Sequence, residues 1–309
     1  MDPVKEEAVV PTAAGDAAPT PEEVLDQIRA EIASGTPLVG SLAVRFYRAV
    51  HALDPTATED SLAVLPGNRG VQLYDSPIAW APMVAGERVL DLGCGSGGAT
   101  RAAARVVGPE GMVVGIDSSP ECVAAAQERT PTELPVLFRR GDAQAMGNVP
   151  DRTFDCVVAS LVLEQVADLD RTVHEIFRVL RPGGRLVASV TAFDRLRPID
   201  ASFMGAVIAV VGRRAPGALA GRASRASMPH EPRDQLAFNE AGMATVEEQD
   251  VQFAVVMADL DDAWAVFSRT YIAHVLDEEG REELRAVLER RMPHTLYLPV
   301  RFLRSRRPG

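Results

Sequence analysis

The segment from residue 87 to residue 107 constrains the fold more than any other part of this chain. It reads as an apolar strand at about 87–92, a D-x-G-x-G-x-G loop at 91–97 and an alanine-rich helix at about 99–107. Glycines at this spacing let the backbone approach a ligand closely, and the N–H groups that open the next helix face that ligand. The segment predicts a nucleotide-type pocket without saying which nucleotide it takes.

Strands and helices alternate after this segment. The patterns predict strands at about 111–116, 135–139, 154–159 and 184–190, and helices at about 119–128 and 168–181. Such alternation is typical of an α/β fold whose parallel sheet carries helices on both faces. Right-handed crossovers place the carboxyl ends of the strands along one edge, where ligands bind.

The rest of the chain divides into helical additions and a tail. A helix should open at Thr20 in a capping box with Glu23, and a second helix is expected at about 38–53. After residue 190 we expect an insertion with a helix near 199–211, and then a helix, a strand, two helices and a last strand near 231–242, 244–255, 261–291 and 295–304. We expect a disordered tail at 1–19, an N-terminal helical cap at 20–69 and an α/β domain at 70–309. The α/β domain contains an inserted helical lid at about 191–230.

Composition narrows the classes of partner. A net charge of −11 disfavours nucleic acid, whose phosphates need basic residues. No apolar stretch approaches the roughly 18 residues of a membrane span, so we expect no membrane partner. The three cysteines form no C-x-x-C pair, which predicts no metal site and fits a reducing cytoplasm. The sequence leaves open whether the chain forms a homodimer.

Three aspartates follow or end predicted strands and carry the chemistry. Asp91 begins the glycine loop, and Asp117 stands where its carboxylate could accept hydrogen bonds from the two hydroxyls of a ribose. Asp142, in Gly-Asp-Ala, can accept a hydrogen bond from an adenine amino group. Two of them have a simpler alternative, because Asp117 could open a helix and Asp142 could be an ordinary turn aspartate.

Five segments carry a family resemblance. They are VLDLGCGSGG at 89–98, VVGIDSSPECV at 113–123, RRGDAQAM at 139–146, FDCVVASLVLEQVADL at 154–169 and RVLRPGGRL at 178–186. In the order and spacing of these segments, the chain resembles class I S-adenosylmethionine-dependent methyltransferases of the ubiquinone/menaquinone type, which act on small molecules. The resemblance is strong over about 70–190, weaker over 231–309 and absent elsewhere.

The resemblance implies a Rossmann-like, seven-stranded, mostly parallel sheet with an antiparallel last strand. It implies S-adenosylmethionine as cofactor, S-adenosylhomocysteine as product and a small-molecule acceptor. Asp91, Gly93, Gly95 and Gly97 would surround the methionine part of the cofactor, and Ser160 would lie near the methyl donor. Asp117 would hold the ribose and Asp142 with Ala143 the adenine; the expected cofactor set also includes Tyr74 and Ser118.

Methyl transfer from a sulfonium mainly requires an acceptor held in line, and a base helps only a weakly acidic acceptor. Many relatives carry a histidine after the fourth strand, where this chain has Gln165. The candidate catalytic residues are therefore Glu164 and His230. A helix-start charge and a surface histidine are their simpler interpretations, and the other four histidines have weaker claims.

Apolar side chains of the covers suggest a fairly apolar acceptor, such as a natural product or a quinone-like molecule, under a mobile lid. The residues considered for this pocket are Tyr74, Trp80, Phe203, Met204 and Ile208. Six arginines after Glu289 are expected to form a solvated face. Three alternatives stay open: a cyclase or pericyclase that keeps the cofactor, a binding or regulatory protein, and a nicotinamide enzyme, although its usual G-x-G-x-x-G loop has a different spacing.

Overall fold

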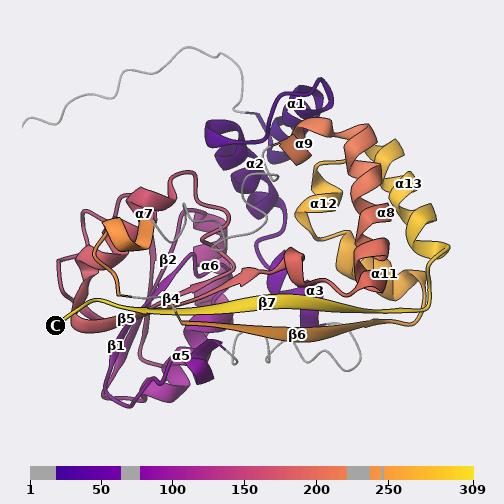
Figure 1. Ribbon diagram of the computed structural model, residues 1–309. Coiled ribbons are helices and arrows are strands. Elements are labelled where there is room, and N and C mark those ends of the chain that lie inside the picture. The colour runs from indigo at the N-terminus through magenta and orange to yellow at the C-terminus, as the bar shows by residue number, and fades with distance from the viewer. Residues whose placement is uncertain (1–18, 64–76, 221–236, 245–246) are drawn as a thin grey trace, which may run out of the picture.

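The computed structural model describes residues 19–63, 77–220, 237–244 and 247–309, and these residues form a seven-stranded sheet at the centre of the molecule (Figure 1). The strand order is β3-β2-β1-β4-β5-β7-β6. The strands are β1 (Arg88–Leu92), β2 (Met112–Asp117), β3 (Val136–Arg140), β4 (Phe154–Ser160), β5 (Leu180–Thr191), β6 (Glu247–Met257) and β7 (His294–Arg306).

Strand direction follows the expected pattern. The first five strands pair in parallel, whereas β7 pairs antiparallel with both β5 and β6. The central strands are covered on both faces and are therefore apolar along their length, as in β4, where Phe154 to Ala159 are all buried. The sheet confirms the expected Rossmann-like fold with an antiparallel last strand.

Three helices connect the parallel strands, namely α5 (Gly98–Val107), α6 (Pro120–Arg129) and α7 (Leu169–Val179). Helix α6 begins because Ser119 accepts a bond from the N–H of Cys122, and α7 begins because Asp168 accepts from Arg171. These caps fix where each helix starts and therefore where each preceding loop lies at the sheet edge.

A second layer of helices packs at the end of the sheet where β6 and β7 extend beyond the other strands (Figure 1). Its buried side chains form one apolar cluster that joins the N-terminal helices, the inserted helix and the C-terminal helices. We call this layer the helical cap. Its members are α1 (Pro21–Ala33), α2 (Gly40–Leu53), α3 (Ala57–Ala63), α8 (Pro198–Arg214), α9 (Pro216–Ala220), α11 (Leu260–Phe267), α12 (Tyr271–His274) and α13 (Glu278–Glu289).

The helical cap joins two parts that are expected separately from the sequence, the N-terminal cap and the inserted lid. Helix α1 packs against α9 and shares a core with α8. The region 261–291 holds three helices rather than two. The expected capping box of Thr20 and Glu23 is present. The expected tail lies outside the described residues except for residue 19. Residues 221–230 of the lid and residues 231–236 of the next predicted helix also lie outside them, whereas residues 237–240 of that helix are helical.

Two of the arginines of β7, Arg301 and Arg304, do not lie on a solvated face as expected, whereas Arg306 is exposed. Arg301 is only 1% exposed, and its guanidinium pairs with Asp250 on β6 at 2.7 Å. Arg304 pairs with Glu247, its partner in the strand register. Cross-strand charge pairs of this kind hold neighbouring strands together, so this part of the arginine-rich end belongs to the sheet. Among the described residues no helix combines the length and apolar character that crossing a membrane requires.

Candidate functional site

The glycine loop after β1 forms the floor of a cavity at the carboxyl edge of the sheet. The N–H groups of Gly93 and Cys94 both donate to the carbonyl of Ile116 on β2, at 2.8 and 3.0 Å. A Cβ at Gly93 would lie 2.3 Å from Cγ2 of Val162, and the φ of +67° also requires glycine. At Gly95 a Cβ would meet no atom within 4 Å, because this side of the loop opens into the cavity.

Asp91 lies beneath this loop and is fully buried. The hydroxyl of Thr100 donates to Oδ2 at 2.5 Å, whereas Oδ1 has no hydrogen-bond partner among the described residues. The pKa of this carboxyl is raised to about 7, chiefly by burial and also by the nearby charge of Asp117, while the hydrogen bond from Thr100 opposes the rise. A buried carboxylate with one oxygen free is suited to a cationic group in the cavity.

Asp117 ends β2 and holds the glycine loop from the other side. Its Oδ2 accepts from the N–H of Gly95 and its Oδ1 from the N–H of Ser119, both at 2.9 Å. Each carboxylate oxygen retains a second lone pair, and both Asp117 and Ser118 line the cavity. Asp117 therefore both orders the loop that opens α6 and presents an acceptor to a ligand.

Asp142 and Ala143 follow β3 and line the same cavity. Oδ1 of Asp142 accepts from the N–H and the side chain of Gln144, at 2.9 and 3.1 Å. The residue thus forms a turn, as its simpler interpretation held, and it also lies at the cavity wall. The structure brings together all three aspartates that the sequence singled out.

The segment after β4 forms a further wall of the cavity and contains Gln165, the position where the sequence lacks the expected histidine. Ser160 and Gln165 line the cavity. Glu164 is not among the lining residues, and its carboxylate accepts from the N–H and hydroxyl of Thr191 at 3.1 and 2.8 Å. Glu164, one of the two expected catalytic residues, therefore binds the end of β5 instead of facing the cavity.

The helical cap closes the cavity from above. Tyr47 and His51 from α2, Glu59 from α3 and Tyr271 from α12 all line the cavity, whose volume is about 200 Å³. The rings of Tyr47 and Tyr271 pack edge to face with centroids 4.8 Å apart. The cavity therefore has an anionic, glycine-rich floor and an aromatic roof.

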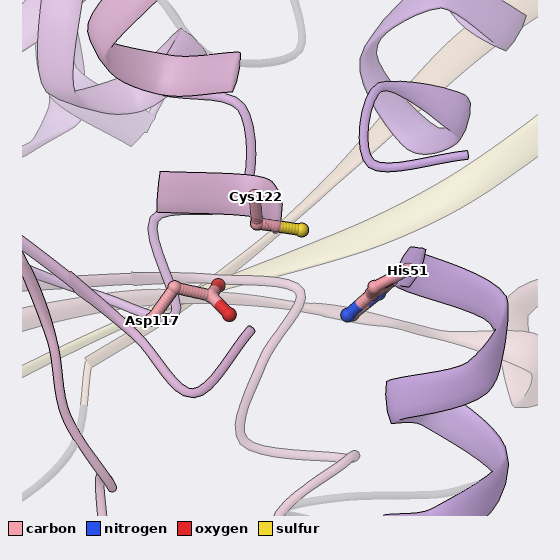
Figure 2. Close-up of side chains that lie close together, drawn as sticks. All are labelled: His51, Asp117 and Cys122. Carbon is pink, nitrogen blue, oxygen red and sulfur yellow. The ribbon is translucent and has the colours of Figure 1, made fainter. Parts of the chain in front are cut away.

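Figure 2 shows how closely the helical cap approaches Asp117. Ligand atoms of His51, Asp117 and Cys122 lie within 4.8 Å of one another. These residue types can bind zinc, but burial raises the pKa of the Cys122 thiol to about 12, and zinc requires a thiolate. Burial also lowers the pKa of His51, against the opposing charges of Asp117 and Glu121. The arrangement brings a neutral imidazole to the carboxylate at the ribose position.

Several residues that the sequence assigned to the site are not found among those that line the cavity. Tyr74 and His230 lie outside the described residues. Gly97 precedes α5 but does not line the cavity, since it packs toward Arg101 and Phe138. Of the residues considered for the acceptor pocket, none that the structure describes lines the cavity: Phe203 and Met204 are buried in the core of the helical cap, Ile208 is exposed, and Trp80 packs on Phe302.

The sequence interpretation missed the residues of the roof. Tyr47 and His51 are four residues apart on α2, so they share one helix face, and this spacing could have marked them as a pair. Nothing in the sequence indicates that Tyr271 meets them, because 220 positions separate it from His51. Such a contact depends on how the helical cap packs as a whole.

Comparison with known proteins finds similar sequences and similar folds. Residues 90–188 match a family model described as a methyltransferase domain. The ubiquinone/menaquinone biosynthesis C-methyltransferase UbiE of Pasteurella multocida is 39% identical over 118 residues, which cover 37% of this chain and 44% of that protein. The chain spans less than half the length of the first curated relatives that it matches.

Solved structures share the fold at low sequence identity. The YcgJ protein of Bacillus subtilis has a TM-score of 0.55 at 19% identity and covers 77% of this chain and 99% of its own. The [4+2]-cyclase SpnF has a TM-score of 0.54 at 21% identity and covers 95% of this chain and 98% of its own. Likeness at these identities concerns the fold alone, and the coverage by SpnF extends over the helical cap as well as the sheet.

Proposed function

We propose that this chain, whose residues 90–188 match a methyltransferase-domain model, is a class I, S-adenosylmethionine-dependent methyltransferase. Its acceptor would be a fairly apolar small molecule, quinone-like or a natural product. The observation that carries the proposal is the joint position of Asp91, Asp117 and Asp142 on one cavity floor beneath an aromatic roof.

The residues present fit this cofactor. The free Oδ1 of buried Asp91 faces no protein donor among the described residues and suits the positively charged methionine part. The second lone pairs of Asp117 suit the two ribose hydroxyls. Asp142 and Ala143 lie where an adenine edge would be recognised, and the open side of Gly95 leaves room for close approach.

Positioning is the main contribution of this chain to the reaction. When bound, the cofactor supplies a methyl group already activated by a positive sulfur. The loop after β4 and the roof residues Tyr47 and Tyr271 hold an acceptor against it and exclude water. The ordered cap contacts then reduce the entropic cost of bringing the two reactants into line.

The lining of the upper cavity supports an acceptor with an apolar body. Val44, Leu161, Val162 and Val166 contribute apolar surface beside the two tyrosines. An aromatic or quinone-like ring would pack well against such a lining. The UbiE relative is named for quinone biosynthesis, which supports the same class.

The test is a transfer assay with S-adenosylmethionine labelled in its methyl group. The purified chain is mixed with a panel of phenols, quinols, aromatic amines and polyketide-like carbon acids, and products are analysed by mass spectrometry. We expect S-adenosylhomocysteine to accumulate together with one labelled product class. Acceptor conversion without S-adenosylhomocysteine, or no transfer to any acceptor by a chain that binds the cofactor, would contradict the proposal.

A further inference from the structure

A hydrogen-bonded chain of three side chains crosses the roof of the cavity. Nε2 of His51 lies 2.8 Å from the hydroxyl of Tyr271, and that hydroxyl donates to Oε1 of Gln165 at 3.2 Å. The three residues come from α2, the start of α12 and the loop after β4, and all three line the cavity. Holding the proposed cofactor does not require this chain of contacts.

Gln165 can only accept a bond from Tyr271. Its amide nitrogen donates to the carbonyl of Leu161 at 2.7 Å, which turns the amide oxygen toward the tyrosine. A phenol has a single proton and can accept further bonds. The proton of Tyr271 therefore has at least two acceptors in reach, namely Oε1 of Gln165 and Nε2 of His51 when that nitrogen is unprotonated. The side chain of Thr58 also hydrogen-bonds to Tyr271.

The surroundings of His51 suit a group that takes up a proton and then holds it. Burial lowers its pKa, so the imidazole is neutral at neutral pH. The charged and titratable groups that face it are Asp117 from β2, Glu121 and Cys122 from α6, and Tyr271 from α12. The carboxylates of Asp117 and Glu121 would stabilise the imidazolium once it forms.

We infer that Tyr271 takes the proton from a hydroxyl acceptor while its own proton passes to His51, so that the substrate class is weakly acidic hydroxyl compounds such as phenols and enols. This inference rests on the proposed function and deepens it. The acceptor O–H bond breaks as its oxygen bonds the methyl carbon, and the electron pair of the S–CH₃ bond stays with sulfur. His51 gains the net proton and later releases it to water.

The arrangement also explains why Gln165 is compatible with catalysis. An amide cannot act as a base at neutral pH, but it can fix the phenol of Tyr271 in place. Tyr271 would be the group that touches the acceptor, and His51 acts through it. Burial raises the pKa of the Tyr271 hydroxyl, so the phenol stays protonated and needs His51 to receive its proton.

Two variants of the full chain test the inference, Tyr271→Phe and His51→Gln. The phenylalanine keeps the ring that packs against Tyr47, and the glutamine keeps a polar side chain on α2. His274→Gln is the matched control, because His274 is also a half-buried histidine of the helical cap but does not line the cavity. Melting and S-adenosylmethionine binding are measured first for all three, so that rates are compared between folded chains saturated with the cofactor.

Acceptors of different acidity then separate a proton-transfer role from a structural one. For weakly acidic phenols we expect both variants to lower kcat by roughly 100-fold, the usual size of a lost general base, with KM little changed. For 4-nitrophenol at alkaline pH, which is already ionised, the loss should be less than about threefold. An equal loss for both acceptors, or transfer only to nitrogen or carbon, would overturn the inference and leave the proposed function intact.

A measurement without turnover completes the test. The ring ¹⁵N shifts of the histidines, assigned with His51→Gln, report the pKa and tautomer of His51 in the cofactor-free chain. We expect a pKa below the ordinary value and a changed tautomer balance in Tyr271→Phe. A His51 that is protonated at neutral pH, or that does not respond to Tyr271→Phe, would overturn the inference, whereas a chain that transfers no methyl group to any acceptor overturns the proposed function.

Discussion

The ionisation of the Asp91 carboxyl should control how tightly the chain binds S-adenosylmethionine. Its pKa is raised to about 7 because the carboxyl is fully buried, so a cationic ligand must displace the proton when the pH is lower. We predict that S-adenosylmethionine binds roughly tenfold more weakly for each pH unit below about 7, and that the affinity levels off above it. Titration calorimetry in buffers of different ionisation enthalpy measures both the affinity and the released proton.

The Asp91→Asn variant tests the same group in the free chain. Because the folded pKa of Asp91 lies above its ordinary value of 3.8, the carboxyl favours folding when protonated and loses that advantage as the pH rises toward 7. Raising a pKa from 3.8 to about 7 corresponds to about 4 kcal/mol. The asparagine variant should therefore melt higher than the parent at alkaline pH, although it binds the cofactor poorly. A lower melting temperature of Asp91→Asn than of the parent chain at alkaline pH would show that the buried charge of Asp91 does not destabilise the fold.

Individual residues differ in how far the sequence predicts them. Asp91, Asp117 and Asp142 end or follow neighbouring strands, and parallel topology alone brings them to one edge. Glu164 could not be placed in this way, because its bonds to Thr191 depend on the local course of the loop. His51 and Tyr271 meet only through the packing of the helical cap.

At the scale of elements, α3 is fastened to the glycine loop. Glu59 accepts from the hydroxyl of Ser96 at 2.6 Å and pairs with Arg101 of α5 at 2.5 Å, and both guanidinium and carboxylate are mostly buried. Charge-assisted bonds of this kind contribute about 2 kcal/mol. They connect the helical cap directly to the loop that would hold the cofactor.

We predict that Glu59→Gln weakens S-adenosylmethionine binding roughly tenfold, equivalent to about 1.4 kcal/mol, because the loop and the cap lose their connection. Glu31→Gln is the control, since Glu31 meets Arg45 at 3.5 Å in a pair that is exposed on both sides and contributes little. Calorimetry of both variants makes the comparison. Equal affinities of Glu59→Gln and the parent chain would show that the connection has no part in binding.

Elements of the sheet follow from the sequence because short apolar runs alternate with capped helices. The predicted strands and the three connecting helices agree with the structure to within a few residues. The helices at 261–291 are less clear, because α12 has only four residues. An element this short has too few positions to show a helical period.

Strands β6 and β7 connect the two parts of the molecule, because each contributes buried side chains to two apolar clusters. Val255 and Leu296 lie in the core of the helical cap, whereas Phe253 and Phe302 of the same two strands pack in another cluster over the sheet. Disruption of one core should therefore weaken the other. The sequence did not predict this coupling, because it depends on how far β6 and β7 extend.

Phe203 of α8 tests this coupling. Its ring is 2% exposed and stacks on His294 at the start of β7, with centroids 4.4 Å apart. We predict that Phe203→Ala lowers the free energy of unfolding by about 3–5 kcal/mol and that the whole chain still melts in one calorimetric transition. Ile208→Ala, on the exposed side of the same helix, should cost less than about 1 kcal/mol. Two separate transitions would contradict the shared core.

Binding of S-adenosylmethionine to the cavity floor is the property on which the proposed function most directly depends, and titration calorimetry of the full chain measures it. We predict saturable one-to-one binding of S-adenosylmethionine, no heat with NAD⁺, at least tenfold weaker binding by Asp117→Asn and unchanged binding by Asp170→Asn, whose side chain is exposed on α7. Absence of binding by the parent chain, or an affinity that Asp117→Asn leaves unaltered, would contradict the account.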